Sequence, residues 1–384
     1  MAKVLLVDTN ASASPLYRSL CNAGHEVYVA GGNPNDFLAK CGKNYVNLDY
    51  SDTHALSELI TKLEIDYLVP GCNDLSYQVC AILNSDGRFP GIETLENNEI
   101  LNNKENFRSF AREQGLPVPR VYSTDDLKKI EFPVIVKPVD SFSGRGITII
   151  QEDNRHLLDT AITEARKQSR SGGYLIEEYV SGQLHSHSAF IANGSIVADM
   201  IVEEHCTANL FAVDTSRVLT NFPAHVLHIL RSATQKMAKT LQLKDGLVHI
   251  QFIRKDDSVW LIEPTRRCPG DLYSRLIEMA TDLNYADNYV RPFLGQPYRF
   301  TSDASVKRLV MRHTITDPEG GHFWALHFNE AVEVSEYVAL CISGDPIKPA
   351  PSGRVGILFA SAPDDQAFEK LYKNAINRNL YKLD

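Results

Sequence analysis

The sequence predicts a two-part fold that combines α/β and α+β organisation, and three observations carry that prediction. Short apolar strands alternate with helical patterns over the first 95 residues, which indicates βαβ units and a parallel sheet. The later half instead contains hairpins, with Asn193-Gly194 as the clearest turn signal. With 384 residues, the chain is long enough for two or three domains, each with its own core.

The N-terminal part is expected to be a small doubly wound domain. Its elements are strands at 3–7, 25–30 and 67–70, a helical pattern that ends near Gly24, and a helix at 53–63. Residues 8–11 and 71–74 follow two of the strands, at the sheet edge where such folds bind ligands. Plain connecting turns are the alternative for both segments. No G-x-G-x-x-G follows the first strand, so a dinucleotide site of the usual kind is not supported.

The rest of the chain is expected to be α+β. A helix is predicted at 101–114, and Gly115-Leu-Pro-Val-Pro119 after it is a rigid connector and a plausible boundary. The predicted strands that follow are 132–136, 146–150, 174–180, 187–191, 196–203, 247–253, 258–263, 306–312 and 355–359. The predicted helices are 156–169, 224–243, 272–280 and 366–375.

Composition excludes several kinds of protein. The chain has 39 Lys plus Arg against 48 Asp plus Glu, and this net charge of -9 argues against general nucleic-acid binding. The seven cysteines contain no C-x-x-C pair, so they are expected to be reduced thiols of a cytoplasmic protein. No apolar run approaches the roughly 18 residues that span a bilayer, so no membrane partner is expected.

The first segment with chemical character ends a buried strand with a lysine. Lys137 follows the apolar run 132–136, and a charge in such a place is costly unless an anion compensates it. The loop at 141–146 then supplies serines and glycines, which can present hydroxyl and N–H groups to phosphate oxygens. Taken alone, the loop could also be an ordinary hairpin turn.

Two further segments contain candidate ligand-binding residues. Residues 174–180, Tyr-Leu-Ile-Glu-Glu-Tyr-Val, can supply an apolar slot with donors and acceptors for adenine, or simply form an edge strand with solvated glutamates. In the hairpin 247–265, period-2 alternation places His249 and Gln251 on one face, with Val248, Ile250 and Phe252 on the buried face. Oxygen donors there suit Mg²⁺, and the Arg266-Arg267 pair suits phosphate; a surface Glu–Arg cluster is the alternative.

In this order, the lysine with its glycine loop, the Glu-Glu-Tyr-Val segment and the Glu-x-Thr-Arg-Arg hairpin resemble the ATP-grasp family. The resemblance covers most of the chain. Residues 102–107, followed by Gly115–Pro119, are similar to the first lysine segment of that family. It implies an ATP-grasp fold with an N-terminal βαβ (pre-ATP-grasp) domain, a mobile lid and an antiparallel-sheet catalytic domain. The expected domains are 1–95, 96–300 with the lid at about 118–182, and 301–384 as a C-terminal extension of the catalytic domain.

The resemblance also implies residue roles and cofactors. The cofactors are ATP and Mg²⁺, with Mn²⁺ as an alternative metal. Arg267, Lys137 and Arg145 are implied as catalytic residues. The implied nucleotide-binding residues are Lys104, Lys137, Ser141, Ser143, Gly144, Gly146, Glu177, Glu178, Tyr179 and Val180. The implied metal ligands are Glu263, Gln251 and Thr265.

The sequence departs from the family pattern at the metal site and at the ribose. Gln251 and Thr265 stand where the family usually has an acid and an asparagine, which removes one negative charge. Asp271, Asp214 and Glu203 are candidates to supply that charge. Leu184 occupies the place of the usual ribose-binding acid, so His185 or His187 is a candidate ribose contact.

The expected reaction is ATP-dependent ligation of a carboxylate to an amine through an acyl phosphate, with release of ADP and phosphate. A small carboxylic acid or amino acid and an amine are the expected substrates, and a homodimer is the expected assembly. Asp271 either caps the helix at 272–280 or leaves its positive end open to a substrate carboxylate. Arg217 is a candidate carboxylate anchor. A purine-biosynthesis-type carboxylase or formyltransferase and a catalytically impaired nucleotide-binding module remain as alternatives.

Overall fold

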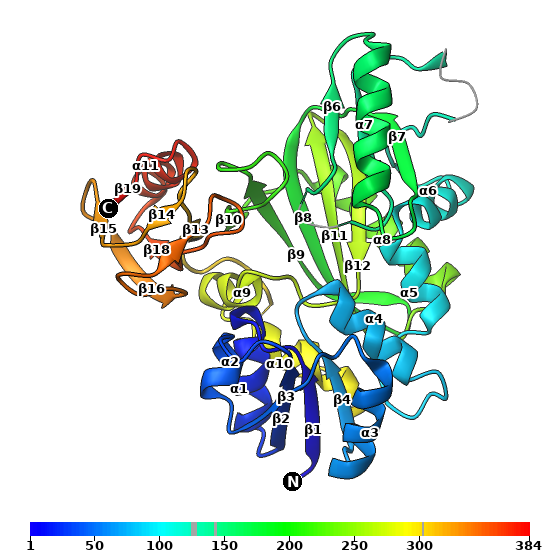
Figure 1. Ribbon diagram of the computed structural model, residues 1–384, viewed down its shortest axis with the longest axis vertical. Helices are drawn as coiled ribbons and strands as arrows, with labels where there is room; N and C mark the ends of the chain where they lie inside the picture. Colours follow the sequence, from blue (N-terminus) through cyan, green and yellow to red (C-terminus); the bar gives the residue numbers. More distant parts are fainter. Residues whose placement is uncertain (124–128, 142–143, 302) are drawn as a thin grey trace.

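The computed structural model describes residues 1–123, 129–141, 144–301 and 303–384 (Figure 1). Its helices are α1 (Ser14–Asn22), α2 (Phe37–Cys41), α3 (Thr53–Leu63), α4 (Asp74–Leu83), α5 (Leu95–Asn102), α6 (Lys104–Glu113), α7 (Arg155–Gln168), α8 (Ala224–Thr240), α9 (Tyr273–Thr281), α10 (Tyr285–Val290) and α11 (Asp365–Ile376), with short 3₁₀ turns η1 (Ala11–Ala13) and η3 (Arg291–Leu294). Within these residues, no helix is long and apolar enough to cross a membrane.

The first four strands form the parallel sheet that the N-terminal alternation predicts. They are β1 (Lys3–Val7), β2 (Glu26–Gly31), β3 (Asn44–Asn47) and β4 (Tyr67–Pro70), in the order β3-β2-β1-β4. Each pair is parallel, so the carboxyl ends of β1 and β4 lie at one edge. Buried Asp8 joins the two loops at this edge, because its carboxylate accepts N–H bonds from Asn10 and Cys72.

An eight-stranded antiparallel sheet dominates the rest of the molecule. Its strands are β8 (Gln183–Ala192), β9 (Ser195–His205), β10 (Thr215–Val218), β11 (Gly246–Lys255), β12 (Ser258–Thr265), β13 (Val310–Ile315), β16 (Glu333–Ala339) and β18 (Gly356–Ser361). They run in the order β12-β11-β8-β9-β10-β13-β18-β16. The β8–β9 hairpin turns at Asn193-Gly194, where both residues have positive φ, as the sequence predicts. Residues beyond 300 thus extend the same sheet.

A smaller three-stranded sheet stands beside it and is covered by α7 (Figure 1). Its strands are β5 (Val134–Pro138), β6 (Thr148–Ile150) and β7 (Tyr174–Glu178). The remaining strands form two short pairs: β14 (Gly321–His322) with β17 (Pro346–Ile347), and β15 (Leu326–Phe328) with β19 (Tyr381–Leu383).

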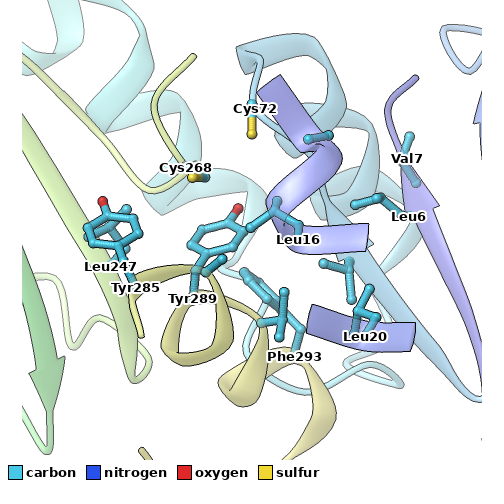
Figure 2. Close-up of a cluster of buried hydrophobic side chains, with 14 of the residues drawn as sticks. Leu6, Val7, Leu16, Leu20, Cys72, Leu247, Cys268, Tyr285, Tyr289 and Phe293 are labelled. Atoms are coloured by element: carbon cyan, nitrogen blue, oxygen red, sulfur yellow. The ribbon is translucent and has the colours of Figure 1, made fainter. Parts of the chain in front are cut away.

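One apolar core connects the N-terminal sheet to the central sheet, as Figure 2 shows. Leu6, Leu16 and Leu20 come from the N-terminal domain, whereas Tyr289 and Phe293 come from α10 and η3. Cys72, after β4, and Cys268, after β12, lie in the same core, and their side chains interact. This packing fixes the end of β12 against the carboxyl edge of the parallel sheet.

The sequence-based elements differ from the structure at two informative places. The helix predicted at 101–114 is two helices, because Asn103 breaks the run and caps α6 by accepting N–H bonds from Glu105 and Asn106. Residues 215–218 form β10 at the centre of the sheet, although they are not among the predicted strands. Four residues are too few for a clear alternation pattern.

Candidate active site

Four charged side chains form a cluster between α6 and the small sheet, which we call the lysine wall: Lys104, Arg108, Lys137 and Glu177. The Lys137 Nζ lies 2.5 Å from one Glu177 carboxylate oxygen, and the Arg108 Nε lies 2.7 Å from the other. Arg108, Lys137 and Glu177 are buried. Burial lowers the pKa of Lys137 to about 8, against the attraction of Glu177, and the charges of Arg108 and Lys104 add to this lowering. Two cations therefore share the Glu177 carboxylate, and Lys104 adds a third positive charge nearby.

Lys104 links this wall to the central sheet. As the first residue of α6, its position is set by the Asn103 cap. Its Nζ donates to the Ser141 carbonyl oxygen at 2.9 Å and lies 3.7 Å from a Glu263 carboxylate oxygen. Lys104, Lys137, the start of the glycine loop and Glu263 are thus brought together, although they are up to 159 residues apart in sequence.

The glycine loop also contacts the central sheet's loops. The Ser141 hydroxyl donates to the Arg145 carbonyl oxygen, and the Arg145 side chain is exposed. Gly144 has a φ of 73°, and a Cβ there would come within 2.5 Å of the Phe211 side chain. Gly146 has a φ of 71°. Ser143 lies outside the described residues. Gly144 is therefore required both for its backbone conformation and for its close approach to Phe211.

The predicted adenine segment is fixed by its side chains. The Glu177 carboxylate is taken up by Lys137 and Arg108, whose charges hold the pKa of Glu177 below its usual value although burial acts to raise it. The Glu178 carboxylate accepts the Arg120 N–H at 2.9 Å. The Tyr179 N–H donates to the Pro133 carbonyl oxygen. Glu177 is therefore occupied by its two cations, and Glu178 helps to position the backbone through Val180.

A line of polar side chains crosses one face of the central sheet, which we call the polar row: Glu263, Gln251, Ser186, Glu204, Ser216 and Arg312. Glu263 faces Gln251 across β12–β11, and Gln251 faces Ser186 across β11–β8. Glu204 of β9 faces Ser216 of β10, which in turn faces Arg312 of β13. The Gln251 Nε2 donates to the Glu204 carboxylate at 2.9 Å, and the Arg312 Nη2 donates to the Ser216 hydroxyl at 3.0 Å.

The end of this row near the lysine wall supplies oxygen donors of the kind that Mg²⁺ prefers. The Glu263 carboxylate is partly exposed, and the neighbouring side chains are the Gln251 amide and the Thr265 hydroxyl. In the described part of the chain, no cluster of three or more His, Cys, Asp or Glu side chains offers an alternative metal site. The residues present therefore fit one hard cation beside the nucleotide phosphates.

The acid that lies beside Gln251 is Glu204, which the sequence analysis did not select. Asp214 is occupied by Thr207 and Ala208, and Asp271 by Arg354. Glu203 alternates with Glu204 along β9 and pairs with Arg217 and His205. None of the three proposed acids reaches Gln251. Burial raises the pKa of Glu204, and Ser186, Gln251 and Arg312 act against that rise.

The two adjacent arginines after β12 have separate environments. The Arg267 Nε donates to Asp74, the first residue of α4, at 2.7 Å, and this attraction raises the pKa of Arg267 although burial acts to lower it. Arg267 also lies near Glu263. Arg266 is instead buried against Glu93 at 3.2 Å and donates to the Lys244 carbonyl oxygen. The expectation that both arginines meet the triphosphate is therefore wrong for Arg266.

A left-handed corner follows the arginines. Asp271 and Leu272 have φ values of 52° and 56°, a conformation that costs non-glycine residues energy. The Asp271 carboxylate pairs with Arg354, and its carbonyl oxygen accepts from Arg312 at 3.1 Å. The expected helix cap at Asp271 is wrong, because Leu272 is the N-cap of α9 and no side chain caps it. The corner instead brings two arginines to the far end of the polar row.

Two other expectations fail because side chains alternate along a strand. His185 stacks on Phe252, and His187 bonds Asp199 and Thr234 of α8. Both point to the opposite face of the sheet from Ser186, so neither is a ribose contact on the nucleotide side. Arg217 is not a free carboxylate anchor, since it pairs with Glu203 at 3.1 Å and with Glu369.

Sequence reasoning missed Arg108, Glu204 and Arg312, and it placed Asp74 at the ligand-binding edge without assigning it a partner. Arg312 had a usable signal, because a cation inside the run Val-Met-Arg-His-Thr-Ile is unusual for a buried strand. The residue before Asp74 is an Asn that caps α4, and this cap marks the start of a helix. It does not reveal that Asp74 pairs with Arg267, 193 residues away. Arg108 and Glu204 reach the site only through the packing of α6 and the register of β9.

Comparison with known proteins identifies a domain that includes several of these residues. A family model described as an ATP-grasp domain matches residues 130–274, which contain Lys137, Glu177, Gln251 and Glu263. The chain is 25% identical over 378 residues to a formate-dependent phosphoribosylglycinamide formyltransferase of Prochlorococcus marinus subsp. pastoris, covering 94% of this chain and 93% of the relative.

Two solved structures share the whole fold. An L-amino acid ligase from Bacillus licheniformis superposes with a TM-score of 0.79 at 17% identity, covering 100% of this chain and 98% of the other. A biotin carboxylase domain from Hydrogenobacter thermophilus, solved with MgADP and bicarbonate, superposes with a TM-score of 0.79 at 15% identity, covering 100% and 90%. Residues 130–274 match an ATP-grasp domain, and the whole chain shares the fold of these ATP-dependent enzymes. This chain is therefore an enzyme that contains an ATP-grasp domain and uses ATP with Mg²⁺.

Proposed function

We propose that this enzyme joins a small carboxylic acid or amino acid to an amine at the expense of ATP. In this reaction, a carboxylate oxygen attacks the γ-phosphorus, the bond to the β-phosphate oxygen breaks, and an acyl phosphate forms with ADP. The amine nitrogen then attacks the acyl carbon, the carbon–oxygen bond to phosphate breaks, and a proton leaves the nitrogen. The products are an amide, ADP and phosphate.

The observation that carries the proposal is the placement of Arg267 between two anion-binding regions. On one side, Lys104 and Lys137 present positive charge next to Glu263. On the other side, the polar row ends at Arg312, with Arg354 beside it through Asp271. Arg267 is fixed by Asp74 and lies within electrostatic reach of both Glu263 and Glu204. This arrangement suits transfer of a phosphoryl group from one bound anion to another.

The residues of this chain divide the work of the transfer. Lys104, Lys137 and the backbone around Gly144 would hold the nucleotide phosphates, and Glu263, Gln251 and Thr265 would hold Mg²⁺. The bound Mg²⁺ supplies charge neutralisation for the transferred phosphoryl group. Arg267 would stabilise the negative charge that develops between donor and acceptor. Arg312 and Arg354 would orient the acceptor carboxylate.

A formyl-transfer version of this chemistry is the second candidate, and the near full-length relatives favour it. Formate is the smallest carboxylate, so the same two steps would attach a formyl group to an amine. This version and amino acid ligation differ in the size of the carboxylate pocket. The two reactions can be distinguished by identifying the carboxylate that the enzyme activates.

The test is phosphate release from ATP and Mg²⁺ with separate sets of carboxylates and amines. We expect release to require one member of each set and to be lost in Lys137→Ala. If formate is the only carboxylate that supports release in the presence of an amine, the enzyme is a formyltransferase. If α-amino acids support release, it is an amino acid ligase. ATP binding without turnover on any pair would contradict the proposal, and a matched Arg266→Lys variant controls for general damage to the fold.

A further inference from the structure

One hydrogen bond in the polar row suggests how this enzyme holds a metal with fewer acids than its family. Gln251 lies between Glu263 on one side and Glu204 on the other, because the sheet order is β12-β11-β8-β9. The Gln251 Nε2 donates to the Glu204 carboxylate at 2.9 Å. A primary amide carries its N–H groups and its oxygen on opposite sides, so its orientation decides whether Gln251 can bind a cation.

The Glu204 carboxylate fixes that orientation. A carboxylate oxygen accepts hydrogen bonds, so it selects the N–H side of the amide and turns the Gln251 Oε1 away from β9, toward Glu263. Glu204 is itself held in place, since it is 3% exposed and its carboxylate also bonds Ser186. It faces Ser216 across the ladder, and that hydroxyl is in turn occupied by Arg312.

We propose that Glu204 is a positioning residue for the metal site: by accepting the Gln251 N–H, it aims the Gln251 carbonyl oxygen at the cation that Glu263 binds. Compared with an arrangement that has an acid at position 251, this chain has the amide at position 251 and the acid at position 204. The inference depends on Mg²⁺ binding and not on which carboxylate or amine is used.

The exchange has a consequence for double substitution. Gln251→Glu alone places two carboxylates at a separation of about 3 Å, where they repel and one takes up a proton. Combining it with Glu204→Gln restores a donor–acceptor pair with the roles reversed, and the ionised oxygen then faces Glu263. Neighbouring substitutions that share one hydrogen bond are expected to be strongly non-additive.

The test measures the affinity of Mn²⁺ for the enzyme–ADP complex by electron paramagnetic resonance, with metal-free ADP binding as the control readout. We expect Glu204→Leu, which removes the acceptor for the Gln251 N–H, to weaken Mn²⁺ binding about tenfold, as loss of a partner behind a metal ligand commonly does. Metal-free ADP binding should stay within twofold of native. Gln251→Glu with Glu204→Gln together should bind Mn²⁺ at least as tightly as the native enzyme.

Three outcomes would overturn the inference. Native Mn²⁺ affinity in Glu204→Leu would show that Glu204 does not orient Gln251. Equal loss of Mn²⁺ and metal-free ADP binding would indicate a structural role only. A double variant no better than the worse single variant would show that no exchange exists. If Glu204→Leu does not fold, the double variant decides alone, because it keeps a hydrogen-bonded pair between positions 204 and 251: Mn²⁺ binding about tenfold weaker than in the native enzyme would overturn the inference.

Discussion

The lysine wall and the polar row manage charge in opposite ways. In the lysine wall, Lys137 and Arg108 share the single carboxylate of Glu177 and Lys104 lies nearby, so positive charge remains for an anionic ligand. In the polar row, Gln251, Ser186 and Ser216 lie between the charged residues Glu263, Glu204 and Arg312, so each charge has a neutral neighbour. We propose that the first arrangement attracts phosphate, whereas the second separates a cation site from an anion site on one sheet face.

This difference explains why two arginines next to each other in sequence have different roles. Arg267 faces the boundary between the two regions and is held by Asp74. Arg266 points away and is buried against Glu93, where it joins β12 to the segment before α5. The alternation of side chains at the end of β12 therefore separates a functional arginine from a structural one.

The largest expected effect tests that separation. Arg267→Met should lower the rate of ATP-dependent phosphate release roughly 100- to 1000-fold, because a preorganised charge at the developing anion is lost. Arg266→Met should instead lower the free energy of unfolding by roughly 3–5 kcal/mol, because Glu93 is left buried without its partner. Steady-state rates of the folded variants measure the loss of activity, and urea denaturation of both variants measures the loss of stability. Equal rate losses in the two variants would contradict the assignment.

Removing the central cation of the lysine wall should have the next largest effect. Lys137→Ala is expected to weaken ADP binding roughly 10- to 100-fold, corresponding to loss of a charged hydrogen bond of about 1.5–3 kcal/mol. Arg312→Met, in the polar row, should leave ADP binding unchanged and raise the KM for the carboxylate. Isothermal titration with ADP compares the two variants. Weaker ADP binding in the Arg312 variant would show that the polar row also takes part in nucleotide binding, contrary to the separation of the two regions.

The pKa of Lys137 predicts a pH dependence that the polar row does not share. Bound phosphate favours the ammonium form, so ADP affinity should fall as pH rises above about 8, by at most about tenfold per unit. The same depressed pKa makes the unfolded chain bind more protons between pH 8 and 10.5, so the Lys137 contribution to stability should rise over that window. ADP titrations from pH 7 to 9.5 test this, and Lys137→Arg, which keeps its charge, should show a flat profile.

The smallest expected effect concerns the carboxylate that holds Arg267. Asp74→Asn keeps a hydrogen-bond acceptor but removes the charge, so the rate should fall about 3- to 10-fold with ADP affinity unchanged. Asp52→Asn, at the cap of α3 away from the site, is the matched control. A larger loss of ADP affinity than of rate would place Asp74 in nucleotide binding and not at the boundary.

The sequence was informative where function depends on local pattern. Lys137, Glu177, Gln251 and Glu263 lie on or at the end of strands that the sequence predicts, and the structure brings these strands together. Glu204 could not be selected, because Glu203 and Glu204 are chemically identical neighbours and only the register of β9 places one of them beside Gln251. Arg108 and Asp74 find their partners across 69 and 193 residues, and no local signal encodes such distances.

The most direct test of carboxylate activation uses a carboxylate substrate labelled with ¹⁸O in both oxygens. If a carboxylate oxygen attacks the γ-phosphorus and leaves with phosphate when the amine attacks, one ¹⁸O atom must appear in each released phosphate. Mass spectrometry of the phosphate measures the transfer. We predict one labelled oxygen per phosphate in the native enzyme with both substrates present; unlabelled phosphate released together with amide product would contradict the acyl phosphate route.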